Sequence, residues 1–185
     1  MKINEKVENF KTNAFYKGEL KEIDLSEYDG KWKILFFYPA DFTFVCPTEL
    51  GEMADYHEEF KKEGAEIFSI STDTEFVHLA WFNDSPTIGK VKFPMLADPT
   101  GKISKDFGVY IEEAGLALRG TFVIDPDGIL KLAEINDLGI GRSAKELLRK
   151  LRAAKFVREH GEVCPASWEP GDKTLIPGVD LIGKI

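Results

Sequence analysis

A buried strand that runs directly into a helix constrains this chain more than any other feature. Residues 31–40, KWKILFFYPA, carry a continuous apolar run, which is typical of a β-strand covered on both faces. The period then changes to helical spacing over residues 50–60, and Pro47 suits the first position of that helix. The junction, PADFTFVCPTEL over residues 39–50, therefore places Cys46 as the last residue before the predicted helix.

The same alternation of strand and helix patterns continues along the chain. AEIFSISTD and FPMLAD predict further strands, and TEFVHLAWFND and GKISKDFGV predict helices. Hairpins are expected around Lys17-Gly18 and around Pro126-Asp127-Gly128. The segment SAKELLRKLRAAKF predicts a long helix with a capping box and an apolar stripe. The box is Ser143 and Glu146, and the stripe is Leu147, Leu148, Leu151, Ala154 and Val157.

This order of elements predicts one α/β domain, with a central mixed β-sheet and helices on both faces. Residues 1–160 are expected to form the domain, and residues 161–185 an irregular C-terminal arm of the same structural unit. The arm carries Trp168, Leu175 and Ile176, which we expect to be exposed and to need a packing partner, such as a second subunit. In such sheets ligands bind at the carboxyl ends of strands, where Cys46 is predicted to lie.

Composition narrows the classes of function. The 185-residue chain has a net charge of −8, which argues against binding to nucleic acid or to an anionic membrane surface. No apolar run approaches the roughly 20 residues that span a bilayer, and the polar start MKINEKVENF does not resemble a signal peptide, so a cytoplasmic protein is expected. The two cysteines and three histidines are too widely spaced for a zinc site, so no metal is expected.

A thiol at Cys46 would meet the unpaired N–H groups and the positive dipole end of a helix, both of which favour the thiolate. Thr43, three residues earlier, places a hydroxyl within reach of the sulfur, and the Pro39 ring can shield a small pocket from water. A lone cysteine beside apolar residues is, however, usually a small buried hydrophobe. Position alone therefore leaves both roles open.

The motif P-x-x-x-T-x-x-C, followed by P-T-E, resembles the active-site signature of the peroxiredoxins, thiol peroxidases with a thioredoxin-like fold. EVCPASW resembles the resolving-cysteine segment of the typical two-cysteine class, and GLALRGTFVIDPDG and GIGRSAKELLRKL resemble the segments with the active-site arginine and the last helix. The closing DLIGKI is similar to the tail of the bacterial alkyl hydroperoxide reductase C subunits. The resemblance spans essentially the whole chain.

The resemblance implies a role for each matching residue. Cys46 matches the peroxidatic cysteine, which attacks a peroxide and becomes a sulfenic acid. Thr43 and Arg119 match the residues that bind the peroxide and stabilise the charges of the reaction, and Pro39 matches the shielding proline. Cys164 matches the resolving cysteine, which forms a disulfide with Cys46 of the other subunit. Glu49 and Arg142 match residues that orient Arg119.

The resemblance also implies partners. The expected assembly is a homodimer, with five dimers forming a decamer. The expected electron donor is an NADH-dependent flavoprotein disulfide reductase or thioredoxin, which restores both thiols by exchange. The chain itself carries no flavin or nicotinamide motif, so no cofactor is expected on it.

Rival interpretations exist for these residues and for the protein. Arg119 and Arg142 could be surface charges, Glu49 a helix-dipole partner, Thr43 a strand-end residue and Cys164 an idle thiol. A thioredoxin-type oxidoreductase typically needs C-x-x-C, but Glu49 stands three residues after Cys46. A non-enzymatic scaffold or holdase is the other alternative, and the complete signature favours catalysis.

One departure from the family pattern concerns over-oxidation. Easily over-oxidised peroxiredoxins carry a Gly-Gly-Leu-Gly loop and a Tyr-Phe pair in the tail. This chain has Ala114-Gly115-Leu116-Ala117 and no Tyr-Phe pair after residue 160. The resulting hypothesis is a robust enzyme, in which the arm unfolds locally and disulfide formation outruns sulfinic acid formation.

Overall fold

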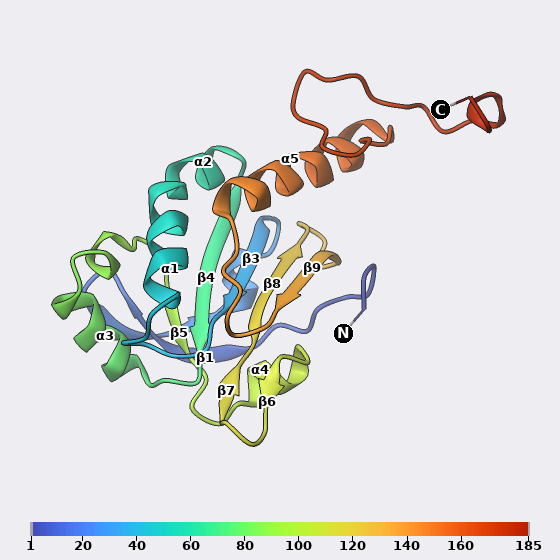
Figure 1. The fold of residues 1–185 in the computed structure, drawn as a ribbon. Coiled ribbons are helices and arrows are strands. Elements are labelled where there is room, and N and C mark those ends of the chain that lie inside the picture. The colour runs from blue at the N-terminus through green and yellow to red at the C-terminus, as the bar shows by residue number, and fades with distance from the viewer. Residues whose placement is uncertain (1, 185) are drawn as a thin grey trace. The chain divides into compact units, whose positions relative to one another are not determined.

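The computed structural model describes residues 2–184 and shows a mixed central β-sheet with flanking helices, as the sequence predicts (Figure 1). Met1 and Ile185, which the predicted domain ranges include, lie outside the described residues. The strands are β1 Lys11–Tyr16, β2 Glu19–Asp24, β3 Trp32–Phe37, β4 Ala65–Ser71, β5 Met95–Ala97, β6 Tyr110–Ile111, β7 Leu116–Ala117, β8 Arg119–Ile124 and β9 Leu130–Asn136. The helices are α1 Cys46–Asp55, α2 His57–Lys62, α3 Glu75–Asp84, α4 Lys102–Asp106 and α5 Ala144–His160, with 3-10 turns at Leu25–Tyr28, Ile88–Lys90 and Val179–Leu181.

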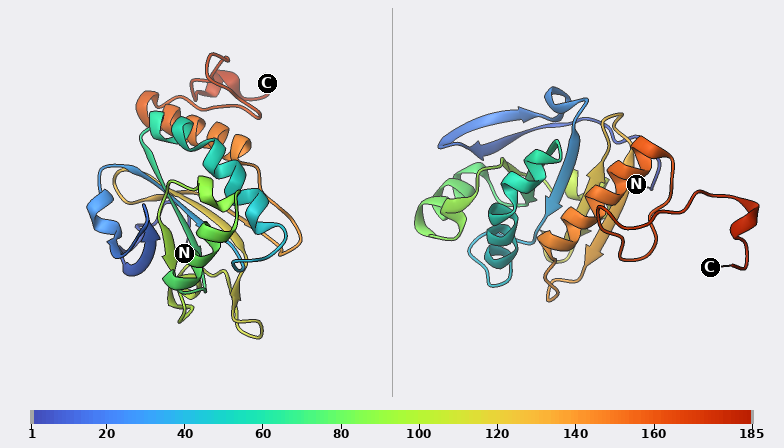
Figure 2. Two further views of the ribbon diagram at one scale, coloured as in Figure 1. Left: turned by 90° about the vertical axis from the view of Figure 1, so that its left-hand side faces the viewer. Right: turned by 90° about the horizontal axis from the view of Figure 1, so that it is seen from above.

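The main sheet has seven strands in the order β2-β1-β5-β4-β3-β8-β9. The pairs β3–β4 and β4–β5 are parallel, whereas β1–β5, β3–β8 and both hairpins are antiparallel. The β1–β2 hairpin, blue in Figure 2, turns at Lys17 (φ 54°) and Gly18 (φ 83°), so the predicted turn is confirmed. The short β6–β7 pair forms a second sheet that the sequence patterns did not predict.

The central strand β3 is buried along its whole length, as its continuous apolar run predicts. Because side chains alternate along a strand, Leu35 and Phe37 enter a core cluster with Ile103 of α4. The Phe37 ring lies 5.2 Å from Phe107 and 5.6 Å from Phe122, between ring centroids. Phe36 points to the opposite face, so both faces of the sheet are covered.

The segment after β3 forms two short helices where the sequence predicted one. The break falls at Tyr56, whose ψ of 0° interrupts the helical path between α1 and α2. The predicted period nevertheless holds across the break, because Leu50, Met53, His57 and Phe60 are all buried. The spacing of apolar residues identified the buried face correctly, but it does not encode the change of backbone conformation at Tyr56.

The chain divides into two compact units, Met1–Ala144 and Lys145–Ile185. This division lies within the first turn of α5, whereas the predicted boundary between residues 160 and 161 stays a prediction. In α5 the stripe residues Leu147, Leu148 and Leu151 are buried, but Val157 is 40% exposed, so the prediction is wrong for that residue. Among the residues that the structure describes, no helix combines the length and apolarity needed to cross a membrane.

Candidate active site

Cys46 is the first residue of α1, one position earlier than the helix start expected from Pro47. Its side chain is fully buried, and Val45 caps the helix without a side-chain hydrogen bond. The sulfur thus lies at a helix N-terminus whose backbone N–H groups carry partial positive charge.

Arg119 approaches this sulfur from the start of β8. Because β8 runs antiparallel to β3 and pairs Thr121 with Phe36, its first residue lies near the carboxyl end of β3, close to α1. The Arg119 Nη1 atom donates to Cys46 Sγ at 3.4 Å, and Nε donates to the Leu138 carbonyl at 2.8 Å. Two residues 73 positions apart therefore share one buried site.

Glu49 joins Arg119 to Arg142. Its Oε2 accepts from Arg119 Nη1 at 2.6 Å and from Arg142 Nη2 at 3.1 Å. Its Oε1 accepts from both the backbone N and the Nε of Arg142 at 2.8 Å. All three side chains are at most 4% exposed, so these are buried, charge-assisted contacts rather than surface ion pairs.

Arg142 is fixed on its other side by the sheet. Its Nη1 donates to the Gly120 carbonyl at 2.8 Å, and its guanidinium carbon lies 3.5 Å from the Phe36 ring centroid. Burial lowers the pKa of Arg142, and the hydrogen bonds and charge of Glu49 counteract this effect. Arg142 is therefore a rigid support for Glu49, which in turn holds Arg119.

A glycine allows this contact to form. A Cβ atom at Gly141 would lie 3.3 Å from Val45 Cγ1 and 3.9 Å from Glu49 Cγ. Because residue 141 has no side chain, the segment before α5 passes close to α1, and the neighbouring Arg142 reaches Glu49.

Thr43 and Pro39 lie in the loop between β3 and α1. The Thr43 hydroxyl donates to the Ala40 carbonyl at 2.8 Å. This contact differs from the expected bond to sulfur, because a hydroxyl has one proton, and here that proton is used within the loop. The hydroxyl oxygen keeps its acceptor capacity. Pro39 is buried, as expected for a residue that excludes water.

The sequence interpretation missed the residue that anchors this loop. Asp41 is 6% exposed, and its Oδ1 accepts from the Tyr38 hydroxyl at 2.7 Å. Its Oδ2 lies 2.7 Å from His78 Nδ1, and His78 Nε2 lies 3.1 Å from the Leu96 carbonyl oxygen. Burial, reinforced by the Asp41 carboxylate, raises the pKa of Tyr38 well above its usual value. Two signals in the sequence could have identified this pair. Asp41 is an acidic residue that follows a buried strand, and His78 is a histidine within an apolar helix.

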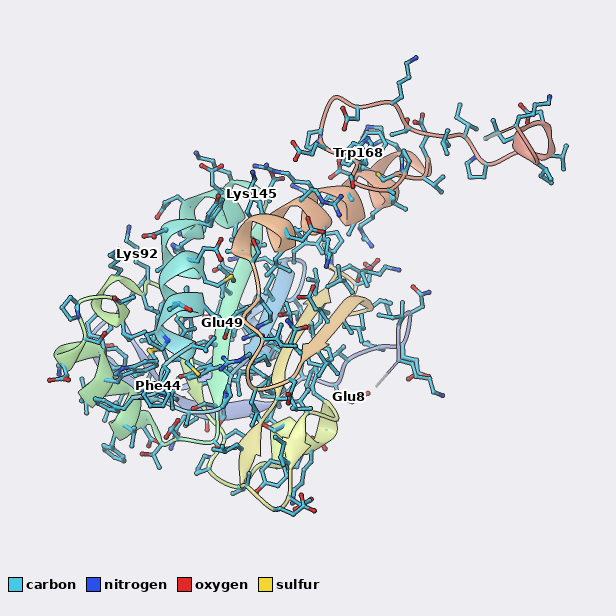
Figure 3. All side chains as sticks on the ribbon, in the orientation of Figure 1. Glu8, Phe44, Glu49, Lys92, Lys145 and Trp168 are labelled. Atoms are coloured by element: carbon cyan, nitrogen blue, oxygen red, sulfur yellow. The ribbon has the colours of Figure 1, made fainter. Side chains whose placement is uncertain are left out.

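Two aromatic residues of the same loop face outward. Phe44, labelled in Figure 3, is 94% exposed, and Phe42 is 53% exposed. Phe42 has a φ of 53°, an uncommon conformation for a bulky residue, and its ring centroid lies 6.0 Å from that of the buried Trp81. The two rings therefore present apolar surface to solvent in the loop that precedes Cys46.

Cys164 lies in the second unit. Its Sγ is 3.8 Å from the Ala153 carbonyl oxygen of α5, and the residue is half-buried. Burial raises the pKa of the Cys164 thiol, an effect that Arg149 partly offsets. The expected exposure of Trp168 is wrong: it is 3% exposed, because its ring packs against Phe156, with centroids 5.0 Å apart.

The structure therefore brings Cys46, Arg119, Glu49 and Arg142 into one connected cluster, with Thr43 and Pro39 in the adjoining loop. Within residues 2–184, no three His, Cys, Asp or Glu side chains cluster as metal ligands. The residue three positions after Cys46 is a glutamate engaged with two arginines, an arrangement unlike the second thiol of a C-x-x-C site.

Comparisons with known proteins agree with this site. Residues 3–133 match the AhpC/TSA family, and residues 153–180 match the C-terminal domain of 1-Cys peroxiredoxin. The chain is 52% identical to alkyl hydroperoxide reductase C of Salmonella typhimurium over 184 residues, which cover 99% of this chain and 98% of the relative.

Solved structures give the same result. The crystal structure of Enterococcus faecalis AhpC is 49% identical, with a TM-score of 0.85 over 88% of this chain and 98% of that chain. The reduced 2-Cys peroxiredoxin of Plasmodium vivax is 34% identical, with a TM-score of 0.92 over 96% and 94%. The thioredoxin-like α/β fold implied by the sequence resemblance is confirmed. The chain belongs to the AhpC/TSA family of peroxiredoxins.

Proposed function

We propose that this peroxiredoxin reduces hydrogen peroxide and organic hydroperoxides at Cys46. The observation that carries the proposal is the contact between Arg119 Nη1 and Cys46 Sγ, 3.4 Å long and buried, at the N-terminus of α1. A cation and the positive end of a helix dipole both lie beside the sulfur, where they can stabilise negative charge during the reaction. We expect the same cation to stabilise the charge that develops on the leaving oxygen.

In the first step the Cys46 thiolate attacks the terminal oxygen of the peroxide. A sulfur–oxygen bond forms, the oxygen–oxygen bond breaks, and the leaving alkoxide or hydroxide takes a proton to become an alcohol or water. Cys46 is thereby oxidised by two electrons to a sulfenic acid. Arg119 stabilises the leaving oxygen, and the Thr43 hydroxyl oxygen can accept the hydrogen bond of the incoming hydroperoxide.

In the second step Cys164 of another subunit resolves the sulfenic acid as an intersubunit disulfide. Support comes from the apolar surface of residues 161–184, whose exposed members are Val163, Ile176, Val179 and Ile182. A hollow of about 300 Å³ lies among this surface, lined in part by Leu175 and Leu181. Apolar surface of this kind is usually covered, and a homodimer would cover it.

The proposed assembly is a decamer of five such dimers. The exposed rings of Phe42, Phe44 and Phe76 support a second interface, because three large aromatic side chains are rarely left in water without a partner. Sedimentation velocity of the reduced protein tests this assembly, and Phe44→Asp should dissociate it. A decamer that survives this substitution would contradict the assigned interface.

The proposed electron donor is an NADH-dependent flavoprotein disulfide reductase, with thioredoxin as the other candidate. The relative in Salmonella typhimurium is named as the C component of an alkyl hydroperoxide reductase, which supports a separate reductase component. A cycle that returns both cysteines to thiols needs a reducing compartment, so the proposed location is the cytoplasm. Reconstitution with each donor, followed by NADH or NADPH consumption, distinguishes them.

The central test is a non-reducing gel after mixing reduced protein with one equivalent of hydrogen peroxide. The wild-type chain should form a covalent dimer, and Cys46→Ser should neither consume peroxide nor form that dimer. Cys164→Ser should consume about one equivalent and then stall, because the sulfenic acid has no resolving thiol. Peroxide consumption by Cys46→Ser at the wild-type rate would refute the proposed function.

A further inference from the structure

The peptide unit that joins Ala40 to Asp41 lies between Thr43 and a second aspartate. Its carbonyl oxygen accepts a hydrogen bond from the Thr43 hydroxyl at 2.8 Å. Its N–H group donates to the Asp73 carboxylate, with 2.8 Å between Asp41 N and Asp73 Oδ2. Because a peptide unit is planar, a carboxylate that fixes the N–H also fixes the direction of the carbonyl. Asp73 and Thr43 are therefore linked through one rigid group.

Asp73 follows β4, the strand that pairs in parallel with β3 (Figure 1). Parallel strands bring their carboxyl ends to one edge of the sheet, so the residues after β4 meet the loop after β3. The Ser71 hydroxyl donates to the same Asp73 oxygen at 2.7 Å, and the Asp73 N–H donates to the Ser71 hydroxyl oxygen at 3.1 Å. This paired local contact orients the carboxylate toward the Asp41 N–H.

The backbone between these two attachments is strained. Phe42 has a φ of 53°, an outlier for a bulky side chain. Such conformations persist only where the surrounding contacts determine them. Phe42 lies inside the turn that the Thr43–Ala40 hydrogen bond closes, and Asp73 holds the N–H of the residue directly before it. Loss of the Asp73 acceptor should let this peptide rotate toward a relaxed conformation and carry the Thr43 hydroxyl with it.

The charge of Asp73 acts in the same direction. A carboxylate at the N–H polarises the peptide, so the carbonyl oxygen of Ala40 becomes a stronger acceptor for the Thr43 proton. A hydroxyl has one proton and two lone pairs, so with its proton held there the Thr43 oxygen keeps its acceptor capacity. The O–H group of a hydroperoxide is a donor that suits this oxygen.

We propose that Asp73 is a positioning residue for peroxide reduction: through the Ala40–Asp41 peptide it holds the Thr43 hydroxyl with its oxygen directed at the incoming hydroperoxide. This inference rests on the proposed function. Asp73 exchanges no proton and forms no bond in the reaction, so its effect is on the orientation of Thr43.

A double-mutant cycle in the full-length chain tests this link, with Asp73→Ala, Thr43→Val and the double variant. The readout is kcat/KM for hydrogen peroxide. Asp73→Asn is the conservative variant, because its amide oxygen can still accept from the Asp41 N–H. Asp106→Ala is the matched control, since the Asp106 side chain is 56% exposed and pairs with Lys102 of the same helix.

A second readout separates an effect on Thr43 from a general disturbance of the site. Alkylation of Cys46 by iodoacetamide is followed across pH in the same variants, in a Cys164→Ser background. This reaction needs the sulfur but no group that accepts a hydrogen bond from peroxide, so a change confined to the Thr43 hydroxyl should leave it unaltered.

Asp73→Ala should lower kcat/KM about tenfold, the effect of one hydrogen bond to a charged acceptor. Asp73→Asn and Asp106→Ala should stay within about threefold of the wild type. The double variant should lose no more than Thr43→Val alone, since a hydroxyl that is absent needs no orientation. Cys46 alkylation should change by less than about twofold in Asp73→Ala.

Wild-type kinetics in Asp73→Ala, multiplied losses in the double variant or a parallel fall in Cys46 alkylation would overturn the inference. Failure of the proposed function appears elsewhere, as peroxide consumption by Cys46→Ser at the wild-type rate. If Asp73→Ala does not fold, Ser71→Ala takes its place in the cycle. Its expected loss is about fivefold, because it removes the neutral hydrogen bond that orients the carboxylate.

Discussion

Replacing Glu49 by glutamine tests the buried charge cluster most directly. The substitution keeps the side-chain shape but removes one negative charge between Arg119 and Arg142. It also replaces one carboxylate oxygen, which accepts hydrogen bonds of 2.6–3.1 Å from the two arginines, by an amide NH2 group that can only donate. Removing one partner of a buried ion pair costs about 3–5 kcal/mol, because the remaining charge stays uncompensated. At roughly 2–4 °C per kcal/mol for a chain of this size, the melting temperature should fall by about 6–20 °C.

Activity should fall as well. Arg119 keeps its contact with the Leu138 carbonyl but loses the carboxylate that directs Nη1 at Cys46. Displacing one preoriented donor typically costs about a hundredfold or more in turnover, so kcat/KM for peroxide should fall to that extent. The measurements are thermal and urea unfolding followed by circular dichroism, and stopped-flow peroxide reduction at a temperature where the variant is folded.

Glu58→Gln is the matched control, since the Glu58 side chain is 64% exposed and 3.6 Å from Lys92. It should change the free energy of unfolding by less than about 0.5 kcal/mol. Glu49→Gln with wild-type stability would show that the two arginines do not need the carboxylate. Lower stability with an unchanged kcat/KM would show that Glu49 does not position Arg119 for catalysis.

Three further substitutions test the surroundings of the site and the acid stability. Thr43→Val should lower kcat/KM for peroxide about a hundredfold, and loss of the 2.8 Å hydrogen bond to the Ala40 carbonyl should lower the free energy of unfolding by about 1 kcal/mol; equal kinetics would exclude its role. Asp41→Ala leaves the Tyr38 hydroxyl without its 2.7 Å acceptor and should lower the free energy of unfolding by about 3 kcal/mol in urea titrations. Hydrogen bonds from Ser26 and then Lys11 lower the pKa of Asp24 from 3.8 to about 2. The ionised carboxylate of Asp24 therefore stabilises the folded protein above pH 3.8, and this contribution is lost as the pH falls through 2. The stability difference between wild type and Asp24→Asn should therefore shrink in acid and stay constant near neutrality.

Periodicity predicted the fold because the buried positions repeat. The apolar run of β3 identified the central strand, and the hairpin predicted around Lys17-Gly18 is present. The break at Tyr56 and the β6–β7 pair were missed, since both depend on local backbone conformation that hydrophobic spacing does not encode.

The sequence predicted those site residues that belong to short local motifs. Cys46 and Thr43 come from one short stretch, whereas Arg119 and Arg142 were placed by resemblance to known segments. Asp41 and His78 were missed because their contact joins a loop to a helix 37 positions away. Only the fold brings such a pair together. The buried state of Trp168 was missed for a similar reason, since its partner Phe156 belongs to the preceding helix.

The net charge of the buried cluster depends on the chemical state of Cys46. Arg119 and Arg142 contribute two positive charges and Glu49 one negative charge, so the cluster has a net charge of +1 with a neutral thiol and zero with a thiolate. Oxidation to a neutral sulfenic acid returns the net charge to +1 in a buried site, where an uncompensated charge is costly. A negative charge on the sulfur would therefore complete the charge balance of the cluster, and conversion to a neutral sulfenic acid would leave one positive charge without a counter-charge.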